Sequence, residues 1–244
     1  CGAKPLFFLD YFASSKLEIS EASRVIKSIA KACRDSSCAL LGGETAEMPG
    51  HYVGKNFDLA GFSVGCVDED RVINNKTIKK NDVLIGIESS GPHSNGFSLI
   101  RKIIKETKLS IEEYDNLVDL ALKPTHLYPN LIMGLLEKFT IHGMAHITGG
   151  GLTENIPRSI PKNLAVNIDT NSWHMPKIFK WLQINGHLSN LDMYRIFNCG
   201  IGMVLIVRKE DSEPLMKEIS KHNFKSFIIG NVVDKNANNS IVFK

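Results

Sequence analysis

Short apolar runs recur along the chain in the pattern expected of buried strands. Residues 6–9 read Leu-Phe-Phe-Leu, residues 39–41 read Ala-Leu-Leu, and residues 83–87 read Val-Leu-Ile-Gly-Ile. Short runs of this kind, ended by turn residues, are typical of strands. Further strands are expected at residues 57–67, 141–147, 165–168, 203–207, 228–233 and 241–243.

Amphipathic helices alternate with these strands. The clearest begins at Ser20 as a candidate N-cap and places apolar residues at helical spacing as far as Cys33, with Arg and Lys on the other face. A second, over residues 97–105, has the same pattern. We therefore predict an α/β fold of mixed sheets covered by helices. Other helical segments are expected at residues 108–125, 130–139, 152–158, 176–183 and 211–222.

The stretch between Asp68 and Asp82 is polar, with an Asn-Asn pair and a Lys-Lys-Asn-Asp turn. Polar linkers of this composition commonly separate domains. We expect two domains, residues 1–72 and 73–244.

Composition and charge exclude several classes of function. The net charge of +3 is small and its positive residues are interspersed with acids, so neither nucleic acid nor an anionic membrane is an expected partner. Apolar runs fall well short of the roughly 18 residues of a membrane span. Five cysteines without a Cys-x-x-Cys motif indicate reduced thiols and a cytoplasmic protein.

The chain begins abruptly at Cys1, and we expect a further N-terminal portion in the parent protein.

The stretch from Ala39 to Gly50 is the first candidate site. An apolar run is expected to end at Gly42 and Gly43, which let a ligand approach the backbone closely. The Glu44 carboxylate that follows suits Mg²⁺, a cation that binds between protein carboxylates and substrate phosphates. The alternative for this motif by itself is a tight turn with solvated acids.

Two glycine loops, residues 89–96 and 148–151, each follow a predicted strand and lead into a helix. This arrangement directs backbone N–H groups and the helix dipole at an anion. We call them the first and second glycine loops, and together they suggest a ligand with two phosphorylated ends or two phosphorylated ligands. His93 and His146 lie beside them, where an imidazole can donate to phosphate or move a proton. The alternative is that these glycines only permit tight turns.

Five motifs occur in order along the chain, at residues 2–11 (Gly-Ala-Lys-Pro-Leu-Phe-Phe-Leu-Asp-Tyr), 42–50 (Gly-Gly-Glu-Thr-Ala-Glu-Met-Pro-Gly), 89–96 (Ser-Ser-Gly-Pro-His-Ser-Asn-Gly), 145–151 (Ala-His-Ile-Thr-Gly-Gly-Gly) and 197–200 (Phe-Asn-Cys-Gly). From end to end the chain resembles the aminoimidazole ribonucleotide synthetase family, the phosphoribosylformylglycinamidine cyclo-ligases of purine biosynthesis. The resemblance implies the two-domain ATP-binding fold of that superfamily and a homodimer with a sheet barrel shared between N-terminal domains. It also implies ATP- and Mg²⁺-dependent closure of formylglycinamidine ribonucleotide to 5-aminoimidazole ribonucleotide, with release of ADP and phosphate.

The resemblance also implies roles for individual residues. His93 and His146 are the expected catalytic residues, and Glu44 is the expected metal ligand. Glu47 is expected to stabilise a loop and Cys199 to pack rather than react. The expected nucleotide-binding residues are Asp10, Gly42, Gly43, Glu44 and Thr45, and the expected substrate-binding residues are Ser94, Asn95, Gly96, Thr148, Gly149, Gly150, Gly151 and Asn198.

Three alternatives stay open at this point. The chain could belong to a formylglycinamidine ribonucleotide synthetase or a selenophosphate synthetase, although the motifs at 42–50 and 197–200 speak against both. It could also be a non-catalytic fragment that binds phosphate or dimerises. The family carries a glycine-rich nucleotide-binding segment ahead of the position of Cys1, so activity of this chain by itself is not assumed.

Overall fold

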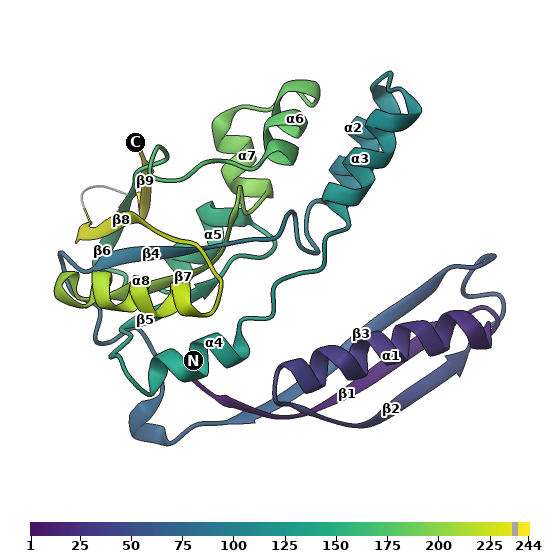
Figure 1. The fold of residues 1–244 in the computed structure, drawn as a ribbon, viewed down its shortest axis with the longest axis horizontal. Coiled ribbons are helices and arrows are strands. Elements are labelled where there is room, and N and C mark those ends of the chain that lie inside the picture. Colours follow the sequence, from purple (N-terminus) through teal and green to yellow (C-terminus); the bar gives the residue numbers. More distant parts are fainter. Residues whose placement is uncertain (236–238) are drawn as a thin grey trace. The chain divides into compact units, whose positions relative to one another are not determined.

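The computed structural model describes residues 1–235 and 239–244 and divides into two compact units (Figure 1). The N-terminal unit comprises residues 2–72 together with residues 127–134. The C-terminal unit comprises residues 73–126 and 135–244, with Cys1. The expected division into two continuous segments therefore differs from these units at Cys1 and at residues 127–134.

The N-terminal unit is a three-stranded sheet with one long helix. Strand β1 (Lys4–Ser14) is central, parallel to β2 (Ala39–Glu47) and antiparallel to β3 (Phe57–Cys66). Helix α1 (Ile19–Asp35) connects β1 to β2, which is the connection that two parallel neighbouring strands require. A 3₁₀ turn (Glu69–Arg71) ends the unit.

Two details of this unit differ from the sequence-based expectation. The strand that was expected to end at Gly42 and Gly43 continues to Glu47, because β2 stays paired with β1 along its whole length. Ser20 is not the N-cap of α1. The helix begins at Ile19 with Glu18 in the N-cap position, and no side-chain hydrogen bond caps it.

Helix α1 covers only one face of the sheet. A groove along α1 is lined by Val25 and Ile29 together with Phe57 and Leu59 of β3, so these strand residues mark the covered face. Phe62, on the opposite face, is 62% exposed. Strand β3 is exposed at every residue. The apolar runs at residues 6–9 and 39–41, which were expected to be buried strands, are exposed or half-buried, so that expectation is wrong for them.

The C-terminal unit is built on a six-stranded sheet of order β5-β7-β4-β8-β6-β9. Neighbouring strands are antiparallel except for the parallel pair β6–β9. The strands are β4 (Val83–Glu88), β5 (Gly143–His146), β6 (Leu164–Ile168), β7 (Ile201–Val207), β8 (Ser226–Asp234) and β9 (Ile241–Phe243). The helices are α2 (Phe97–Glu106), α3 (Ile111–Ala121), α4 (Pro129–Leu136, shared with the N-terminal unit), α5 (Gly151–Arg158), α6 (Lys177–Asn185), α7 (Asn190–Ile196) and α8 (Ser212–Lys221), with a 3₁₀ turn at Lys209–Asp211.

Both faces of the six-stranded sheet are buried. Leu84 and Val204 face a hydrophobic cluster that includes residues of α2, α5, α6 and α7. The alternate residues Ile85 and Leu205 are equally buried, on the face where α8 packs against β4 and β8. Burial on both faces explains why the strand sequences are continuously apolar rather than alternating.

Most predicted elements of the C-terminal unit are confirmed, with ends shifted by a few residues. Helix α7 was not predicted, although a capping box joins Ser189 and Asp192 at its start. Pro176 stands just before α6 as its N-cap, rather than in its first turn.

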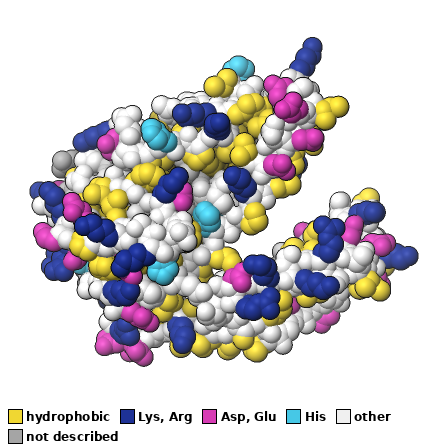
Figure 2. All heavy atoms as spheres, in the orientation of Figure 1, with side chains coloured by type: hydrophobic (Ala, Val, Ile, Leu, Met, Phe, Trp, Pro, Cys, Tyr) yellow, Lys and Arg dark blue, Asp and Glu magenta, His cyan; other side chains and the backbone are white. Residues whose placement is uncertain are grey.

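Charged side chains of both signs are interspersed over the face of the molecule in view, and hydrophobic side chains reach the surface among them (Figure 2). Within the described residues, none of the helices is both long and apolar enough to cross a membrane.

Candidate functional site

Strand order brings three loops to one edge of the six-stranded sheet. Strands β4 and β5 both run antiparallel to β7, which lies between them, so they point the same way. The first glycine loop leaves the end of β4, and the second glycine loop leaves the end of β5. The turn at residues 197–200 leads into β7 at the same edge, where Glu88 pairs with Ile201. Three of the five sequence motifs therefore meet here.

Asn198 holds this turn to the first glycine loop. Its Oδ1 accepts hydrogen bonds from Ser89 Oγ at 2.8 Å and from the Gly200 N–H at 2.9 Å. Its Nδ2 donates to the Gly91 carbonyl at 2.8 Å. Asn198 is buried, so its amide is occupied by the two loops that it joins. This geometry supports a positioning role rather than the direct substrate contact that was expected.

The two glycine loops lie in close contact with Phe197 and with the backbone at Tyr194. A Cβ on Gly96 would lie 2.3 Å from the Phe197 ring, and Gly96 has the left-handed φ of 77°. A Cβ on Gly151, also left-handed at 56°, would lie 2.3 Å from the Tyr194 carbonyl oxygen. Both positions need glycine because a side chain has no space there. The same glycines leave the first N–H groups of α2 and α5 at the ends of their helices, where such groups lack intrahelical partners.

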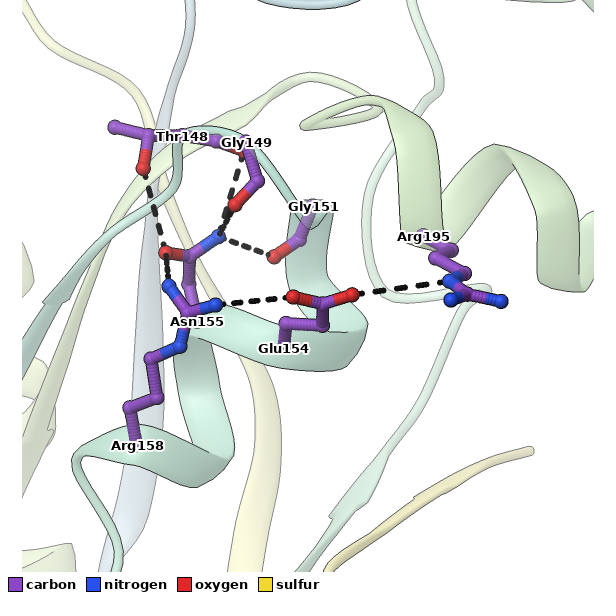
Figure 3. Close-up of polar contacts among 7 residues, drawn as sticks. All are labelled: Thr148, Gly149, Gly151, Glu154, Asn155, Arg158 and Arg195. Carbon is purple, nitrogen blue, oxygen red and sulfur yellow. Dashed lines mark hydrogen bonds and ion pairs between the residues drawn. The ribbon is translucent and has the colours of Figure 1, made fainter.

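The second glycine loop is braced by a residue that the sequence analysis missed (Figure 3). Asn155 Nδ2 donates to the carbonyl oxygens of Gly151 at 2.8 Å, Gly149 at 3.1 Å and Thr148 at 3.4 Å. Its Oδ1 accepts from Thr148 Oγ1 at 3.3 Å. One buried amide thus engages three carbonyls of the loop. The available signal was an Asn in the first turns of a helix that follows a glycine run, where a polar side chain can reach back to the backbone.

A small charged network flanks this brace. Glu154 accepts from Arg158 at 2.9 Å and lies 3.7 Å from Arg195 of α7 (Figure 3). These side chains are largely exposed, and exposed pairs of this kind contribute little to stability. Their position beside the loop still places two guanidinium groups close to a region proposed to bind anions.

His93 has a strained backbone and a buried ring. Its φ of 58° is left-handed, which is uncommon for a non-glycine residue and is often found at functional sites. Its Nε2 accepts a hydrogen bond from the Ser90 N–H at 3.2 Å. Burial, and then the charges of His126 and His146, lower the pKa of His93 to about 4. The ring is consequently neutral at physiological pH.

His146 and a nearby groove complete this part of the site. His146 stands at the end of β5, retains exposure to solvent, and has its pKa lowered by the protein that partly surrounds it. A groove of about 370 Å³ is lined by His93 and Ser94 of the first glycine loop and by Lys123 and Thr125. Asn95 lies close to the second glycine loop, because a Cβ on Gly149 would be 3.6 Å from its side-chain oxygen.

The predicted site residues of the N-terminal unit do not all converge. Asp10 is paired with Gly43, whose missing Cβ would lie 2.5 Å from the Asp10 Oδ1. Glu44 is paired with Tyr11, the next residue of β1. Because side chains alternate along a strand, Asp10 and Glu44 point to opposite faces of the sheet. Asp10 lies on the α1 side, where burial, then Cys38 and then the Asp10 carboxylate raise the pKa of Cys33 in that helix.

The remaining residues of the motif at 42–50 lie along the exposed strand β2. Gly42 and Thr45 are exposed, as is Glu44. Glu47 Oε1 accepts a hydrogen bond from the Leu17 N–H at 2.6 Å, so its carboxylate holds the connection between β1 and α1 rather than the loop of its own motif, where it was expected to act. Among the described residues, no group of three or more His, Cys, Asp or Glu side chains is arranged to hold a metal ion.

Cys199 is a packing residue, as expected. It is fully buried, its backbone carbonyl accepts from the Trp173 indole N–H at 2.9 Å, and burial raises the pKa of its thiol. A thiol in this state is a poor nucleophile.

Solved structures with the same architecture identify the fold class. The chain superposes on the hydrogenase maturation protein HypE of E. coli with a TM-score of 0.73 at 17% identity, covering 99% of this chain and 70% of that one. It superposes on the thiamine-monophosphate kinase of Stenotrophomonas maltophilia with a TM-score of 0.71 at 15% identity, covering 100% of this chain and 73% of that one. At these identities the likeness defines the fold, which is the two-domain fold of AIR synthase-like proteins.

Sequence comparison identifies the family. Residues 1–67 match the family described as AIR synthase related protein, N-terminal domain, and residues 79–242 match its C-terminal domain. Phosphoribosylformylglycinamidine cyclo-ligase of Neisseria gonorrhoeae is 51% identical over 97% of this chain and 70% of its own length. The chain belongs to the phosphoribosylformylglycinamidine cyclo-ligase family of AIR synthase related proteins.

Further relatives carry the same name. The cyclo-ligase of Neisseria meningitidis serogroup C is 55% identical over 87% of this chain and 63% of its own length. The chloroplastic cyclo-ligase of Arabidopsis thaliana is 47% identical over 96% of this chain and 61% of its own length. The chain thus spans about two thirds of the length of these relatives. Their names do not favour the two alternative superfamily enzymes.

Proposed function

We propose that the parent protein is an ATP-dependent ligase that closes formylglycinamidine ribonucleotide to 5-aminoimidazole ribonucleotide. The observation that carries the proposal is the meeting of both glycine loops and His93 at one edge of the six-stranded sheet. The relatives that share the motifs are named for this reaction. Two loops with helix N-termini suit two phosphorylated groups, one on each side of the turn at residues 197–200.

The reaction needs a poor electrophile to be activated. The formyl oxygen of the substrate attacks the γ-phosphorus of ATP, and the bond to the β-phosphate oxygen breaks to release ADP. The amidine-side nitrogen then attacks the formyl carbon, and the carbon–oxygen bond breaks to release phosphate. One proton leaves the attacking nitrogen as the imidazole forms. Positioning of the phosphoryl groups accounts for most catalysis of this kind.

Within this scheme the neutral imidazole of His93 accepts the proton or orients the attacking nitrogen. Its low pKa keeps it able to accept a proton at physiological pH, and bound phosphate would raise that pKa toward the working range. His146 stands across β7 from the first glycine loop and acts at the other phosphorylated end. Ser94, Asn95, Gly96 and residues 148–151 supply donors to phosphate oxygens.

ATP and Mg²⁺ are the proposed cofactors, supported by the family and by a HypE structure described as a complex with ATP. Mg²⁺ is held through one or two carboxylates and substrate phosphates, so a single exposed carboxylate such as Glu44 fits as one ligand. When bound, the ion neutralises charge on the transferring phosphoryl group. Asp10, on the other face of the sheet, is not a second ligand for the same ion within one copy of this unit.

Product formation tests the assignment. The chain, and the longest open reading frame that contains it, are incubated with ATP, Mg²⁺ and formylglycinamidine ribonucleotide, and 5-aminoimidazole ribonucleotide is measured. We expect product that depends on both ATP and substrate. His93→Ala should lower kcat at least about 100-fold, while His174→Ala, at an exposed histidine outside the site, should not. Product from neither protein would exclude the proposed activity.

We also propose that the N-terminal unit dimerises through its uncovered sheet face. Leu9, Phe62 and Val64 are 37%, 62% and 40% exposed on this face, and an exposed apolar patch of this kind marks an association surface. Sedimentation velocity should report a dimer for the wild type and a monomer for Phe62→Asp. Ile184→Asp, at a residue of α6 that is 71% exposed, is the matched control and should stay dimeric. A monomeric wild type at micromolar concentration would exclude the dimer.

A cytoplasmic location is proposed as well. All five cysteines are free, and free thiols persist in reducing compartments. A fusion to a fluorescent reporter in the source cell would test the location directly.

A further inference from the structure

An aromatic ladder stands behind the first glycine loop. The ring of His126 meets that of His93 edge to face, with centroids 6.2 Å apart and planes at 84°. The His126 ring also meets that of Phe224 edge to face, with centroids 5.0 Å apart and planes at 76°. The three rings come from three separate segments: the first glycine loop, the connection after α3, and the turn between α8 and β8.

Hydrogen bonds fix these three segments to one another. Ser90 Oγ donates to the Pro124 carbonyl at 2.6 Å, which ties the first glycine loop to the segment carrying His126. At the other end, Glu88 Oε1 accepts from the Lys225 N–H at 2.9 Å, and the Glu88 N–H donates to the Lys225 carbonyl at 3.0 Å. The backbone on both sides of the ladder is thereby held in place.

The His93 side chain is held at its backbone and at one ring nitrogen. Its backbone is left-handed, its side chain is buried, and its Nε2 accepts a hydrogen bond from the Ser90 N–H. Rotation about the remaining side-chain bonds is limited by what packs against the ring face. A flat, half-buried imidazole such as that of His126 suits this task, because edge-to-face aromatic contacts have a preferred geometry.

We propose that His126, backed by Phe224, is a positioning residue that holds the His93 imidazole in its working orientation and keeps water from its face. The proposal rests on the proposed function in one respect, which is that His93 acts on substrate. His126 itself acts through His93. It was one of six histidines to which the sequence motifs assigned no role.

Nearby charged groups also affect the pKa values of His93 and His126. Burial lowers the pKa of His126, and the Glu88 carboxylate raises it. His93 is faced by His126 and by His146, and the groove beside it is lined by Lys123. Replacing His126 by a smaller residue removes both a covering ring and a positive charge, and both changes raise the pKa of His93. A phenylalanine at position 126 removes the charge alone.

The first test reads His93 directly by NMR of its imidazole, in the chain without substrate. His126→Ala should raise the titration midpoint of His93 by about one pH unit and shift its ring resonances, because water reaches the ring. His126→Phe should leave the ring resonances close to those of the wild type and move the midpoint less. Unchanged His93 signals in His126→Ala, or equal changes in both variants, would overturn the proposal. Should His126→Ala fail to fold, Phe224→Leu removes the ring behind His126 and is expected to raise the midpoint of His93 by a smaller amount, because His126 and its charge remain.

The second test reads catalysis in the active protein. His126→Ala should lower kcat about tenfold with the KM for ATP unchanged, and His126→Phe should recover most of that loss. In a His93→Ala background the further effect of His126→Ala should be less than about twofold, because a residue that acts through His93 has nothing left to position. An additive loss would contradict the proposal. If the wild type makes no product, the proposed function fails while the NMR experiment still decides the positioning role.

Discussion

The two sheets of this chain both contain apolar strand residues, and they differ in how much of that apolar surface the chain covers. Every residue of β3 is exposed, whereas every residue of β7 except Met203 is buried. The difference arises from their neighbours, because α1 covers one face of the smaller sheet, while helices pack on both faces of the larger one. An apolar strand sequence therefore specifies a strand, and tertiary partners decide whether it is buried.

This contrast has a functional side. The covered C-terminal unit can hold loops in strained conformations, since the cost of a left-handed His93 or Gly151 is offset by packing around it. The N-terminal unit presents its motif at residues 42–50 on an open strand. We therefore expect mutations in the C-terminal unit to lower the free energy of unfolding. Mutations on the uncovered sheet face of the N-terminal unit are expected to weaken dimerisation instead.

The largest effect is expected from Phe197→Ala. Phe197 is 1% exposed and packs against Phe179 with ring centroids 5.9 Å apart, so truncation leaves a cavity between the turn at residues 197–200 and α6. The free energy of unfolding should fall by about 3–5 kcal/mol, measured by urea denaturation. A loss below about 1 kcal/mol would show that the C-terminal unit is not tightly packed around Phe197.

A smaller loss is expected from Gly151→Ala. The added Cβ would meet the Tyr194 carbonyl oxygen, so α7 has to move, and the residue has to keep a left-handed φ of 56°. We expect a cost of about 2–3 kcal/mol by the same measurement. Gly134→Ala, in helix α4 with open space around it, is the control and should stabilise by about 0.5–1 kcal/mol. Equal effects at both glycines would contradict the comparison.

The pH dependence of stability comes next. The folded state lowers the pKa of His93 to about 4 from an ordinary value of 6.5, so the unfolded chain binds a proton more readily. The contribution is present in full above about pH 6.5 and is lost as the pH falls toward 4. Between pH 7.5 and 5 the wild type should lose about 2 kcal/mol more than His93→Gln. If the free energy of unfolding of the two proteins changed equally with pH, His93 would not be the source of this pH dependence.

The smallest effect on folding is expected from Phe62→Ala. At concentrations where the chain is monomeric, removing this exposed ring should change the free energy of unfolding by less than about 0.5 kcal/mol. The same substitution should weaken dimerisation measurably at higher concentration. A cost near that of Phe197→Ala would show that the ring is buried within a single copy.

Much of this architecture could be predicted from local pattern. The strands at 83–87 and 203–207, the helix at 97–105 and the strand–glycine loop–helix units are visible in the sequence, because burial on both faces produces continuous apolar runs and helices keep their period. The family resemblance added an ordered set of motifs and hence the candidate residues.

What could not be predicted depends on pairing between distant segments. The register of β1 against β2 decides that Asp10 and Glu44 face opposite ways, and nothing near either residue encodes it. Asn155 is an ordinary polar residue in sequence, and Asn198 stood out only through its motif; only the folded loops show what their amides hold. Likewise His126 gains a role only from the two rings beside it.

The position of β7 between β5 and β4 has a consequence for folding on the ribosome. The Asn198 amide reaches the Gly91 carbonyl across 107 residues of chain, and β7 has to insert between two strands that were synthesised long before it. Contacts of such long range are slow to form because loop closure precedes any gain from them. The edge proposed to bind phosphate is thus assembled late, after residue 207 has emerged. A nascent chain shorter than this should expose unpaired edges of β4 and β5 to chaperones.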